Sequence, residues 1–161
     1  MLSIVTLAPG TKFRRWTDAF LAAEWGSAVA RGGELLDPTL LEGVVALRFS
    51  EPVGAATYLM QADAMEIVTL NATVHRLGVG RMLVDAVSER ARNAGAKAVV
   101  LTTTNDNLDA IAFYESVGFE FVTCRVGAVD DARRTLKPSI PTHAPNGLPI
   151  RDELEFRRRL R

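Results

Sequence analysis

MEIVTLNATVHRLGVGRMLVDAV, residues 65–87, is the stretch that constrains the fold of this chain most strongly. Its first part, residues 65–74, is apolar and β-branched at nearly every alternate position, which is typical of a strand buried on both faces. Gly78 and Gly80 then mark a turn, because residues without Cβ permit unusual dihedrals and a close approach of a ligand to the backbone. The sequence therefore predicts a buried strand, a glycine turn and a helix in direct succession.

The segment after the turn has the periodicity of an amphipathic helix. Its apolar stripe consists of Val79, Leu83, Val87, Ala91 and Ala94, and its polar stripe of Arg81, Asp85, Glu89 and Arg92. Gly95 stands where a left-handed cap is expected to end the helix. The first N–H groups of such a helix have no intrahelical partner and lie at the positive end of its dipole, so they favour an anion. We therefore expect a pyrophosphate at this turn.

A glycine pair after a strand is equally compatible with a tight turn that binds nothing. Two sharper phosphate motifs are absent from the turn. The dinucleotide fingerprint needs a third glycine where this chain has Leu83, and the P-loop needs a Gly-Lys-Ser/Thr sequence that the chain lacks. The segment that follows, residues 97–119, distinguishes between a bound anion and an empty turn.

That segment, the second half of the pattern, begins with KAVVLTTT, residues 97–104, which we interpret as the next buried strand. NDNLDAIAFYESVGF, residues 105–119, follows as a short helix with an Asx-type start and Gly118 as its stop. The spacing of Asn107, Ile111 and Tyr114 places them on one helical face.

With both halves in view, the chain resembles the GNAT superfamily of acyl-CoA-dependent N-acyltransferases. The family signature is a Gln/Arg-x-x-Gly-x-Gly/Ala loop, here residues 75–80, followed by an Asn and a Tyr in a helix that Gly-Phe closes, here Asn107, Tyr114 and residues 118–119. The resemblance covers residues 51–126 most strongly. It implies an α/β protein of the α+β type, with a central mixed, mainly antiparallel sheet flanked by helices.

The resemblance also implies acetyl-CoA as the co-substrate and a set of residues that contact it. Those residues are Leu70, Ala72, His75, Arg76, Leu77, Gly78, Val79, Gly80, Arg81 and Asn107. Leu70 and Ala72 would offer backbone groups to the pantetheine arm, as in strand addition. The family usually has Gln or Arg in place of His75, which concerns a side-chain contact rather than the backbone contacts to phosphate. A helix cap for Asn107 and a surface turn for His75 are the alternatives.

Acyl transfer from a thioester to an amine needs a neutral amine, a stabilised oxyanion and a proton for the departing thiolate. Tyr114 matches the family's general acid, and a phenol can donate a hydrogen bond to sulfur. Glu66 is the candidate base, since the strand alternation predicts that it shares a face with Val68, Leu70 and Ala72, where desolvation disfavours its charged form. The alternatives are packing for Tyr114 and, for Glu66, a solvated or arginine-paired carboxylate.

Composition limits the classes of partner. The 161 residues carry a formal net charge of +0, and the basic run 157–161 follows several acidic residues, so we expect no nucleic-acid partner. No apolar run reaches membrane-spanning length and no export leader is visible, so we expect no membrane partner and a cytoplasmic location. Two separated histidines without a Cys or acidic ligand pattern predict no metal site.

The remaining sequence is interpreted as parts of one domain, residues 1–161. Cys124, the only cysteine, is expected to be a small buried hydrophobe in a reducing compartment. Trp16 and Trp25 lie where the family often builds its acceptor pocket, with core packing as the alternative. The other expected elements are strands at 2–7, 43–49, 53–61 and 119–126, helices at 12–25 and 130–136, a hairpin connection at 50–52, a loop at 137–149 and a last strand within 150–160 that pairs with 119–126.

These observations predict an N-acetyltransferase that moves acetyl directly from acetyl-CoA to a primary amine on a small molecule or a peptide. A non-catalytic acyl-CoA sensor is the main alternative, and the missing third glycine argues against a dinucleotide-binding enzyme. The identity of the amine and the acyl chain length are left open, as is the choice between a monomer and a homodimer.

Overall fold

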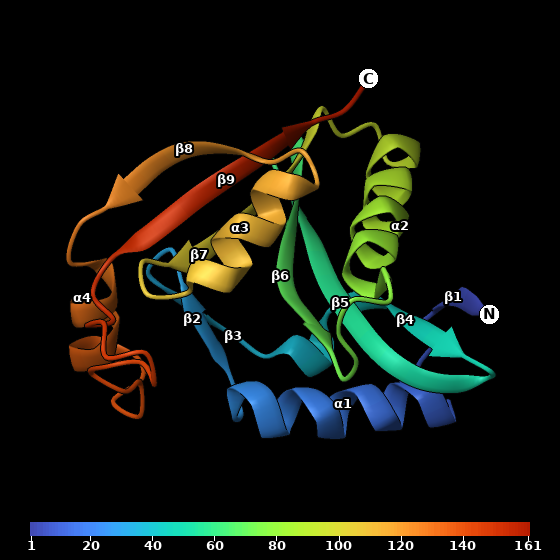
Figure 1. The fold of residues 1–161 in the computed structure, drawn as a ribbon, viewed down its shortest axis with the longest axis horizontal. Coiled ribbons are helices and arrows are strands. Elements are labelled where there is room, and N and C mark those ends of the chain that lie inside the picture. The colour runs from blue at the N-terminus through green and yellow to red at the C-terminus, as the bar shows by residue number, and fades with distance from the viewer. The chain divides into compact units, whose positions relative to one another are not determined.

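The computed structural model describes all residues, 1–161, and the chain divides into two compact units (Figure 1). The first unit comprises Met1–Ala28, Asp37–Val99 and Arg159–Arg161, and the second comprises Val29–Leu36 and Val100–Arg158. The chain contains four α-helices and nine strands, and the pairs β1–β4, β4–β5, β5–β6 and β8–β9 are antiparallel. The expected fold class, mixed α/β with mainly antiparallel strands, is confirmed.

The first unit is built on four strands in the order β1-β4-β5-β6. Its elements are β1 (Leu2–Thr6), α1 (Lys12–Trp25), the 3₁₀ helix η1 (Pro38–Leu40), β4 (Glu42–Arg48), β5 (Glu51–Gln61), β6 (Ala64–Ala72) and α2 (Val79–Asn93). Strand β7 (Ala98–Thr104) begins in this unit and continues into the second. The strand and helix on either side of the glycine turn are thus present as predicted.

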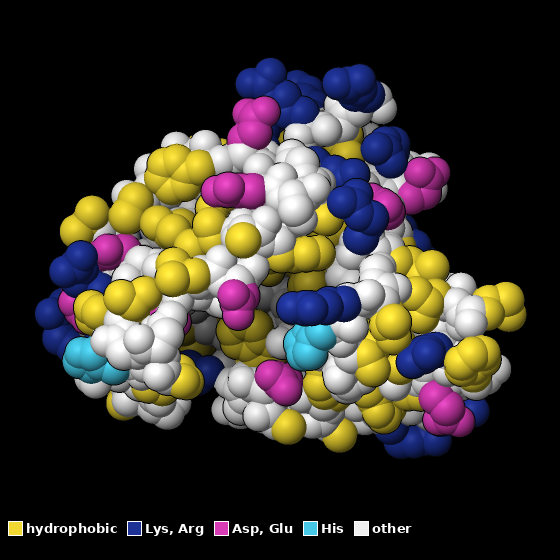
Figure 2. Space-filling model, viewed as in Figure 1, with side chains coloured by type: hydrophobic (Ala, Val, Ile, Leu, Met, Phe, Trp, Pro, Cys, Tyr) yellow, Lys and Arg dark blue, Asp and Glu magenta, His cyan; other side chains and the backbone are white.

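Local signals at their ends explain both helices of this unit. Thr11 caps α1 by accepting a hydrogen bond from the backbone N–H of Arg14 at 3.2 Å, and Gly26 follows its last residue with a φ of +75°. Gly95 follows α2 with a φ of +80°, as predicted. The apolar stripe of α2 is buried up to Ala91, whereas Ala94 lies past the last helical residue and is exposed. Basic and acidic side chains alternate over the outer face of α2 (Figure 2).

The β4–β5 hairpin turns one residue earlier than predicted. Phe49 and Ser50 adopt positive φ values of +50° and +67° and form the turn, while Glu51 and Pro52 already belong to β5. Two residues in the left-handed region suit the right-handed twist of the flanking strands. Pro52 is tolerated in the strand because the register is irregular beside it, between Ala46 and Leu47.

The second unit contains three strands in the order β7-β9-β8 and a separate two-stranded hairpin. Its elements are β2 (Val29–Arg31), β3 (Glu34–Leu36), α3 (Leu108–Ser116), β8 (Glu120–Arg125), α4 (Ala128–Thr135) and β9 (Glu153–Arg159). The predicted pairing of the last segment with residues 119–126 is confirmed by the antiparallel β8–β9 register. The β2–β3 hairpin was not predicted, although Gly32 and Gly33, with φ values of +59° and +79°, form its turn.

The expectation that Cys124 is buried is wrong. Strand β8 stands at the end of its sheet order, and Cys124 is exposed along with its neighbours. Phe121 and Val122 are 56% and 48% exposed, and hydrophobic side chains are visible over β8 in Figure 2. An edge strand with little covering it does not bury the residues that its apolar composition suggests.

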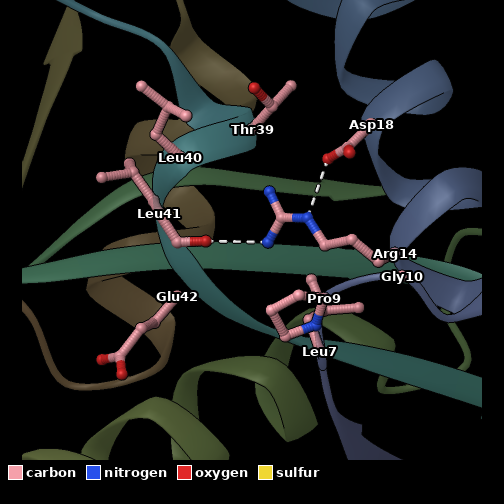
Figure 3. A pocket seen from close by; sticks show the side chains of 9 residues that line it. All are labelled: Leu7, Pro9, Gly10, Arg14, Asp18, Thr39, Leu40, Leu41 and Glu42. Atoms are coloured by element: carbon pink, nitrogen blue, oxygen red, sulfur yellow. Dashed lines mark hydrogen bonds and ion pairs between the residues drawn. The ribbon is translucent and has the colours of Figure 1, made fainter.

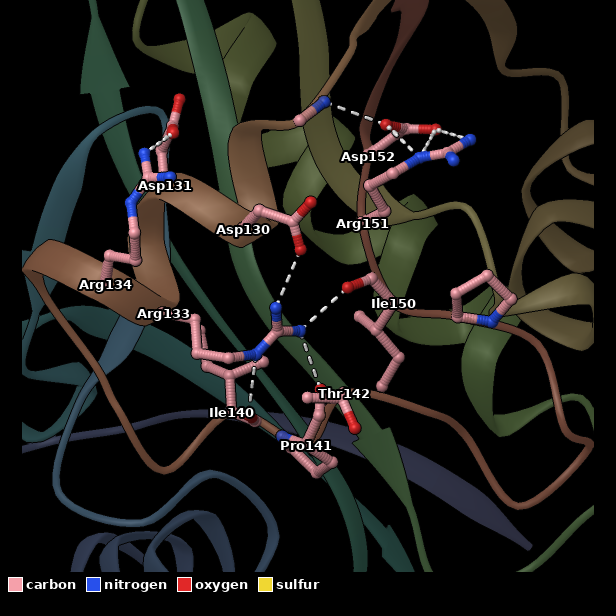
Figure 4. A network of polar contacts seen from close by, with 12 residues as sticks. Asp130, Asp131, Arg133, Arg134, Ile140, Pro141, Thr142, Ile150, Arg151 and Asp152 are labelled. Carbon is pink, nitrogen blue, oxygen red and sulfur yellow. Dashed lines mark hydrogen bonds and ion pairs between the residues drawn. The ribbon is translucent and has the colours of Figure 1, made fainter.

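The predicted loop at 137–149 is held in place by Arg133 of α4 (Figure 4). The Arg133 guanidinium donates hydrogen bonds to the carbonyl oxygens of Ile140, Pro141 and Ile150 at 2.8–2.9 Å and pairs with Asp130 at 2.8 Å. Asp152 accepts a hydrogen bond from the N–H of Gly127, the residue before α4. The loop has a defined path although it contains no helix or strand.

Candidate active site

The glycine turn before α2 is open and lacks a side-chain cap. Gly78 is the N-cap of α2 with a φ of +78°, and no side chain accepts from the first N–H groups of the helix. A Cβ built at Gly78 would meet no atom within 4 Å, so glycine is needed there for its backbone conformation and not for lack of space. His75, Arg76 and Leu77 are exposed beside it. An anion has both free donors and room at this turn.

The turn has a fixed position because the first helical residue is buried beneath it. Val79 is 2% exposed, and its Cγ1 lies 2.9 Å from where a Cβ of Gly54 on β5 would stand. The side chain of Val79 therefore packs into the unit, and only its N–H group is left for a ligand. Gly80 lies in the first turn of the helix, and Arg81 is exposed and already interacts within the protein. These features fit a pyrophosphate bound through backbone N–H groups.

A β-bulge in β6 changes the predicted face of Glu66. Along the β5–β6 register, Tyr58 pairs with Ile67 and Thr57 pairs with Thr69, so Val68 is an extra residue without a partner on β5. The alternation of side chains shifts by one position at Val68. Glu66 consequently shares its face with Thr69 and Asn71, which are opposite Thr57 and Ala55, and the prediction that it shares a face with Leu70 and Ala72 is wrong.

Two contacts identify what covers each face. The indole Nε1–H of Trp25, at the end of α1, donates a hydrogen bond to Asn71 Oδ1 at 2.8 Å, so α1 contacts this face of β6 at Asn71. Tyr58, on the opposite face, interacts electrostatically with Arg90 of α2, and burial raises the pKa of its hydroxyl. Glu66 is 7% exposed and interacts within the protein. Its carboxylate therefore lies in a largely dry setting.

Tyr114 lies on α3 of the second unit and is surrounded by aromatic rings. The ring centroids of Phe113, Phe119 and Phe156 lie 5.5, 5.7 and 6.4 Å from that of Tyr114. Burial raises the pKa of the Tyr114 hydroxyl to about 12, because the phenolate is poorly solvated there. The hydroxyl keeps its proton at neutral pH, which suits a donor and excludes a general base.

Asn107 is the N-cap of α3, yet its side chain does not cap the helix. Its Nδ2 donates instead to Thr103 Oγ1 at 3.4 Å, and the residue is exposed. Asn107 is therefore the N-cap residue of α3 by position but makes no side-chain capping hydrogen bond, and its contact with a cofactor stays a prediction.

The structure brings most of the predicted residues together in the first unit. Glu66, Leu70 and Ala72 come from β6, and residues 75–81 form the turn and the start of α2. Tyr114 and Asn107 belong to the second unit. Sequence reasoning did not place Asn71 on the face of Glu66, because an unbroken alternation assigned it to the opposite face. The available signal in the sequence was Trp25, because the N–H of a buried indole usually needs a hydrogen-bond acceptor.

A pocket of about 460 Å³ lies elsewhere in the first unit, between the β1–α1 turn, η1 and the start of β4 (Figure 3). Arg14 occupies its wall and donates to Asp18 Oδ1 at 2.9 Å and to the carbonyl oxygens of Leu41 and Pro38 at 2.8 and 3.0 Å. None of the predicted site residues lines this pocket. Arg14 therefore joins η1 to α1 and belongs to the fold.

Comparison with known proteins identifies the family. Residues 4–119 match the model of the acetyltransferase (GNAT) family, and the chain belongs to that family. Protein YdhI of Bacillus subtilis (strain 168) is 40% identical over 141 residues, which cover 85% of this chain and 86% of YdhI.

Solved structures share the fold at low sequence identity. An acetyltransferase of Bacillus subtilis in complex with CoA has a TM-score of 0.71 at 17% identity and covers all of both chains. A GNAT family acetyltransferase of Elizabethkingia anophelis with acetyl-CoA bound also has a TM-score of 0.71, at 18% identity, over 99% of this chain and 98% of its own. The resemblance seen in the sequence motifs is thereby confirmed, and acyl transfer is the general activity of the family.

No helix of this protein has both the length and the apolar character needed to cross a membrane. The structure likewise contains no group of three or more His, Cys, Asp or Glu side chains that could hold a metal ion.

Proposed function

We propose that this protein transfers an acetyl group from acetyl-CoA directly to a primary amine of a small molecule or a peptide. The observation that carries the proposal is the open, uncapped N-terminus of α2, which directly follows the strand that buries Glu66. One continuous segment thus offers an anion site and a buried carboxylate. The family membership and the CoA-bound relatives of similar fold support the same assignment.

The phosphates of acetyl-CoA would bind the N–H groups around Gly78, Val79 and Gly80 at the positive end of the α2 dipole. Arg76, Arg81 and His75 stand next to these groups and would add charge or hydrogen bonds from their side chains. Leu70 and Ala72 would hold the pantetheine arm through their backbone groups, as one strand holds another. Leu77 would border the site, and Asn107 would add a polar contact from α3.

In the chemical step, the amine nitrogen forms a bond to the thioester carbonyl carbon and the carbon–sulfur bond breaks. Glu66 would accept the proton that the amine gives up, directly or through a water molecule. Tyr114 would donate a proton to the departing thiolate, a role that its pKa of about 12 keeps available at neutral pH. Binding alone would need no buried carboxylate at the thioester end of the site, so Glu66 favours turnover over a sensor.

A thiol-release assay with acetyl-CoA and a panel of amines tests this proposal. The panel should include small primary amines, polyamines and peptides with a free N-terminus, and mass spectrometry should confirm an added acetyl group on the amine. Amine-dependent release of CoA would support the proposal. Tight CoA binding by calorimetry without release for any amine would replace it with the sensor assignment.

A further inference from the structure

Asn71 stands on the Glu66 face of β6, between the two ends of the proposed acetyl-CoA site. It lies five residues after Glu66 and seven before Gly78. At a rise of about 3.3 Å per residue, Asn71 is roughly 15 Å along the strand from Glu66. A CoA molecule with its pyrophosphate at Gly78 and its thioester near Glu66 has only its pantetheine arm in this interval.

The Trp25 hydrogen bond fixes which way the Asn71 amide faces. An indole N–H is only a donor, so the atom that it contacts at 2.8 Å must be the amide oxygen of Asn71. The Nδ2 group therefore points away from the indole. It donates no hydrogen bond to any protein group, and the residue is only half-buried. Two N–H donors are thus oriented in advance and left without a protein acceptor.

We propose that Asn71 Nδ2 donates a hydrogen bond to an amide carbonyl of the pantetheine arm, with Trp25 as the positioning residue that orients it. The inference rests on the proposed function for its ligand. Pantetheine carries two amide carbonyls, which are its strongest neutral acceptors between the phosphates and the sulfur. Orienting the amide before binding reduces the entropy lost when the contact forms.

Replacing Asn71 with Asp separates this role from a purely structural one. The carboxylate of Asn71→Asp still accepts from the Trp25 indole, so α1 stays anchored, but it offers no donor to a ligand. Calorimetry should compare CoA with 3′-phosphoadenosine 5′-diphosphate, which keeps the phosphates and lacks the pantetheine arm. Asn71→Asp and Asn71→Ala should weaken CoA about three- to tenfold more than they weaken the pantetheine-free probe, the size expected for one hydrogen bond.

Two further variants complete the experiment. Trp25→Phe removes the indole donor and should weaken CoA in the same selective way, whereas Asn93→Asp makes the same charge change at the far end of α2 and should leave both affinities unchanged. Equal losses for CoA and the probe would assign the effect to charge and overturn the inference. Unchanged CoA affinity in folded Asn71→Asp would also overturn it. If the wild-type protein binds neither molecule, the proposed function itself fails.

Discussion

The hydroxyl groups of Thr57 on β5 and Thr69 on β6 lie 2.5 Å apart and are buried from solvent. They form the aligned pair next to the bulge at Val68, on the same face as Glu66. Each hydroxyl finds its hydrogen-bond partner in the other, so the pair favours the register that sets the orientation of Glu66. A one-residue slip would leave two buried hydroxyls unpaired and turn the carboxylate to the other face.

This pair makes a prediction about stability. Thr69→Val should lower the free energy of unfolding by about 1–3 kcal/mol, because it leaves the Thr57 hydroxyl buried without a partner. The double variant Thr57→Val with Thr69→Val should be closer to wild type than the sum of the two single variants. Urea unfolding of all four proteins measures the coupling, and strictly additive losses would show that the hydroxyls do not depend on each other.

The anion site makes a second prediction. Gly80→Glu places a longer side chain and a negative charge in the first turn of α2, so it should weaken CoA binding by repulsion and crowding. Calorimetry with CoA measures the loss, and circular dichroism checks that the sheet is intact. Asn93→Asp, at an exposed position at the other end of the helix, is the matched control. A folded Gly80→Glu protein with wild-type CoA affinity would remove the assignment of the cofactor site.

Tyr114→Phe tests the proposed general acid, since it keeps the ring in its aromatic cluster and deletes only the hydroxyl. If that hydroxyl protonates the leaving thiolate, kcat should fall roughly ten- to a thousandfold while acetyl-CoA binding changes little. Steady-state kinetics with a working amine and calorimetry with CoA give the two quantities. A variant that turns over at the wild-type rate would leave Tyr114 with a packing role alone.

The raised pKa of Tyr114 predicts how stability depends on pH. The folded value of about 12 exceeds the ordinary value of 10.0, so the native state holds the phenolic proton more tightly than the unfolded state does. The resulting stabilisation is complete below pH 10 and is lost as the pH rises from 10 to 12. Thermal unfolding should show a smaller decline over this window for Tyr114→Phe than for wild type. Identical declines would mean that the hydroxyl is well solvated in the folded protein.

Glu66→Gln tests the proposed base through the pH profile of kcat/KM for the amine. A base gives the profile an acidic limb, because protonation of the carboxylate removes its function, and the amine's own deprotonation gives a second limb at higher pH. Gln keeps the shape of the side chain, so the variant should have a lower plateau and only the limb set by the amine. Two amines of different pKa separate the limbs. An unchanged plateau, with a limb that follows the amine in both proteins, would make Glu66 structural.

Local signals predicted the parts of the fold that local interactions determine. Helix α1 spans the predicted residues 12–25, between its caps Thr11 and Gly26. Gly95 follows α2 in the left-handed conformation that was expected there. The glycine turn was recognisable because it joins two long periodic segments. The β2–β3 hairpin was missed although Gly32 and Gly33 mark it, because strands of three residues are too short to show a period.

Features that depend on neighbouring strands were not predictable from the sequence alone. The bulge at Val68 arises from the pairing of β6 with β5, and no residue type in the strand marks it. Because the bulge was not predicted, Glu66 was assigned to the wrong face of β6, and Asn71 was not recognised as lying on the same face as Glu66. The exposure of Cys124 likewise depends on the position of β8 at the end of its sheet order, which its apolar sequence does not encode. The sequence thus predicted which segments form the candidate site but not which way the side chains of β6 point.

The hydrogen bonds from Arg133 to residues 140–150 have an evolutionary consequence. Arg133 contacts that loop through the carbonyl oxygens of Ile140, Pro141 and Ile150, which every amino acid supplies. Substitutions along the loop can therefore change its surface chemistry while its path is kept. Arg133 itself has no such freedom, since a lysine lacks the planar array of donors that contacts three carbonyls at once. Relatives are expected to diverge along this loop while retaining the arginine that holds it.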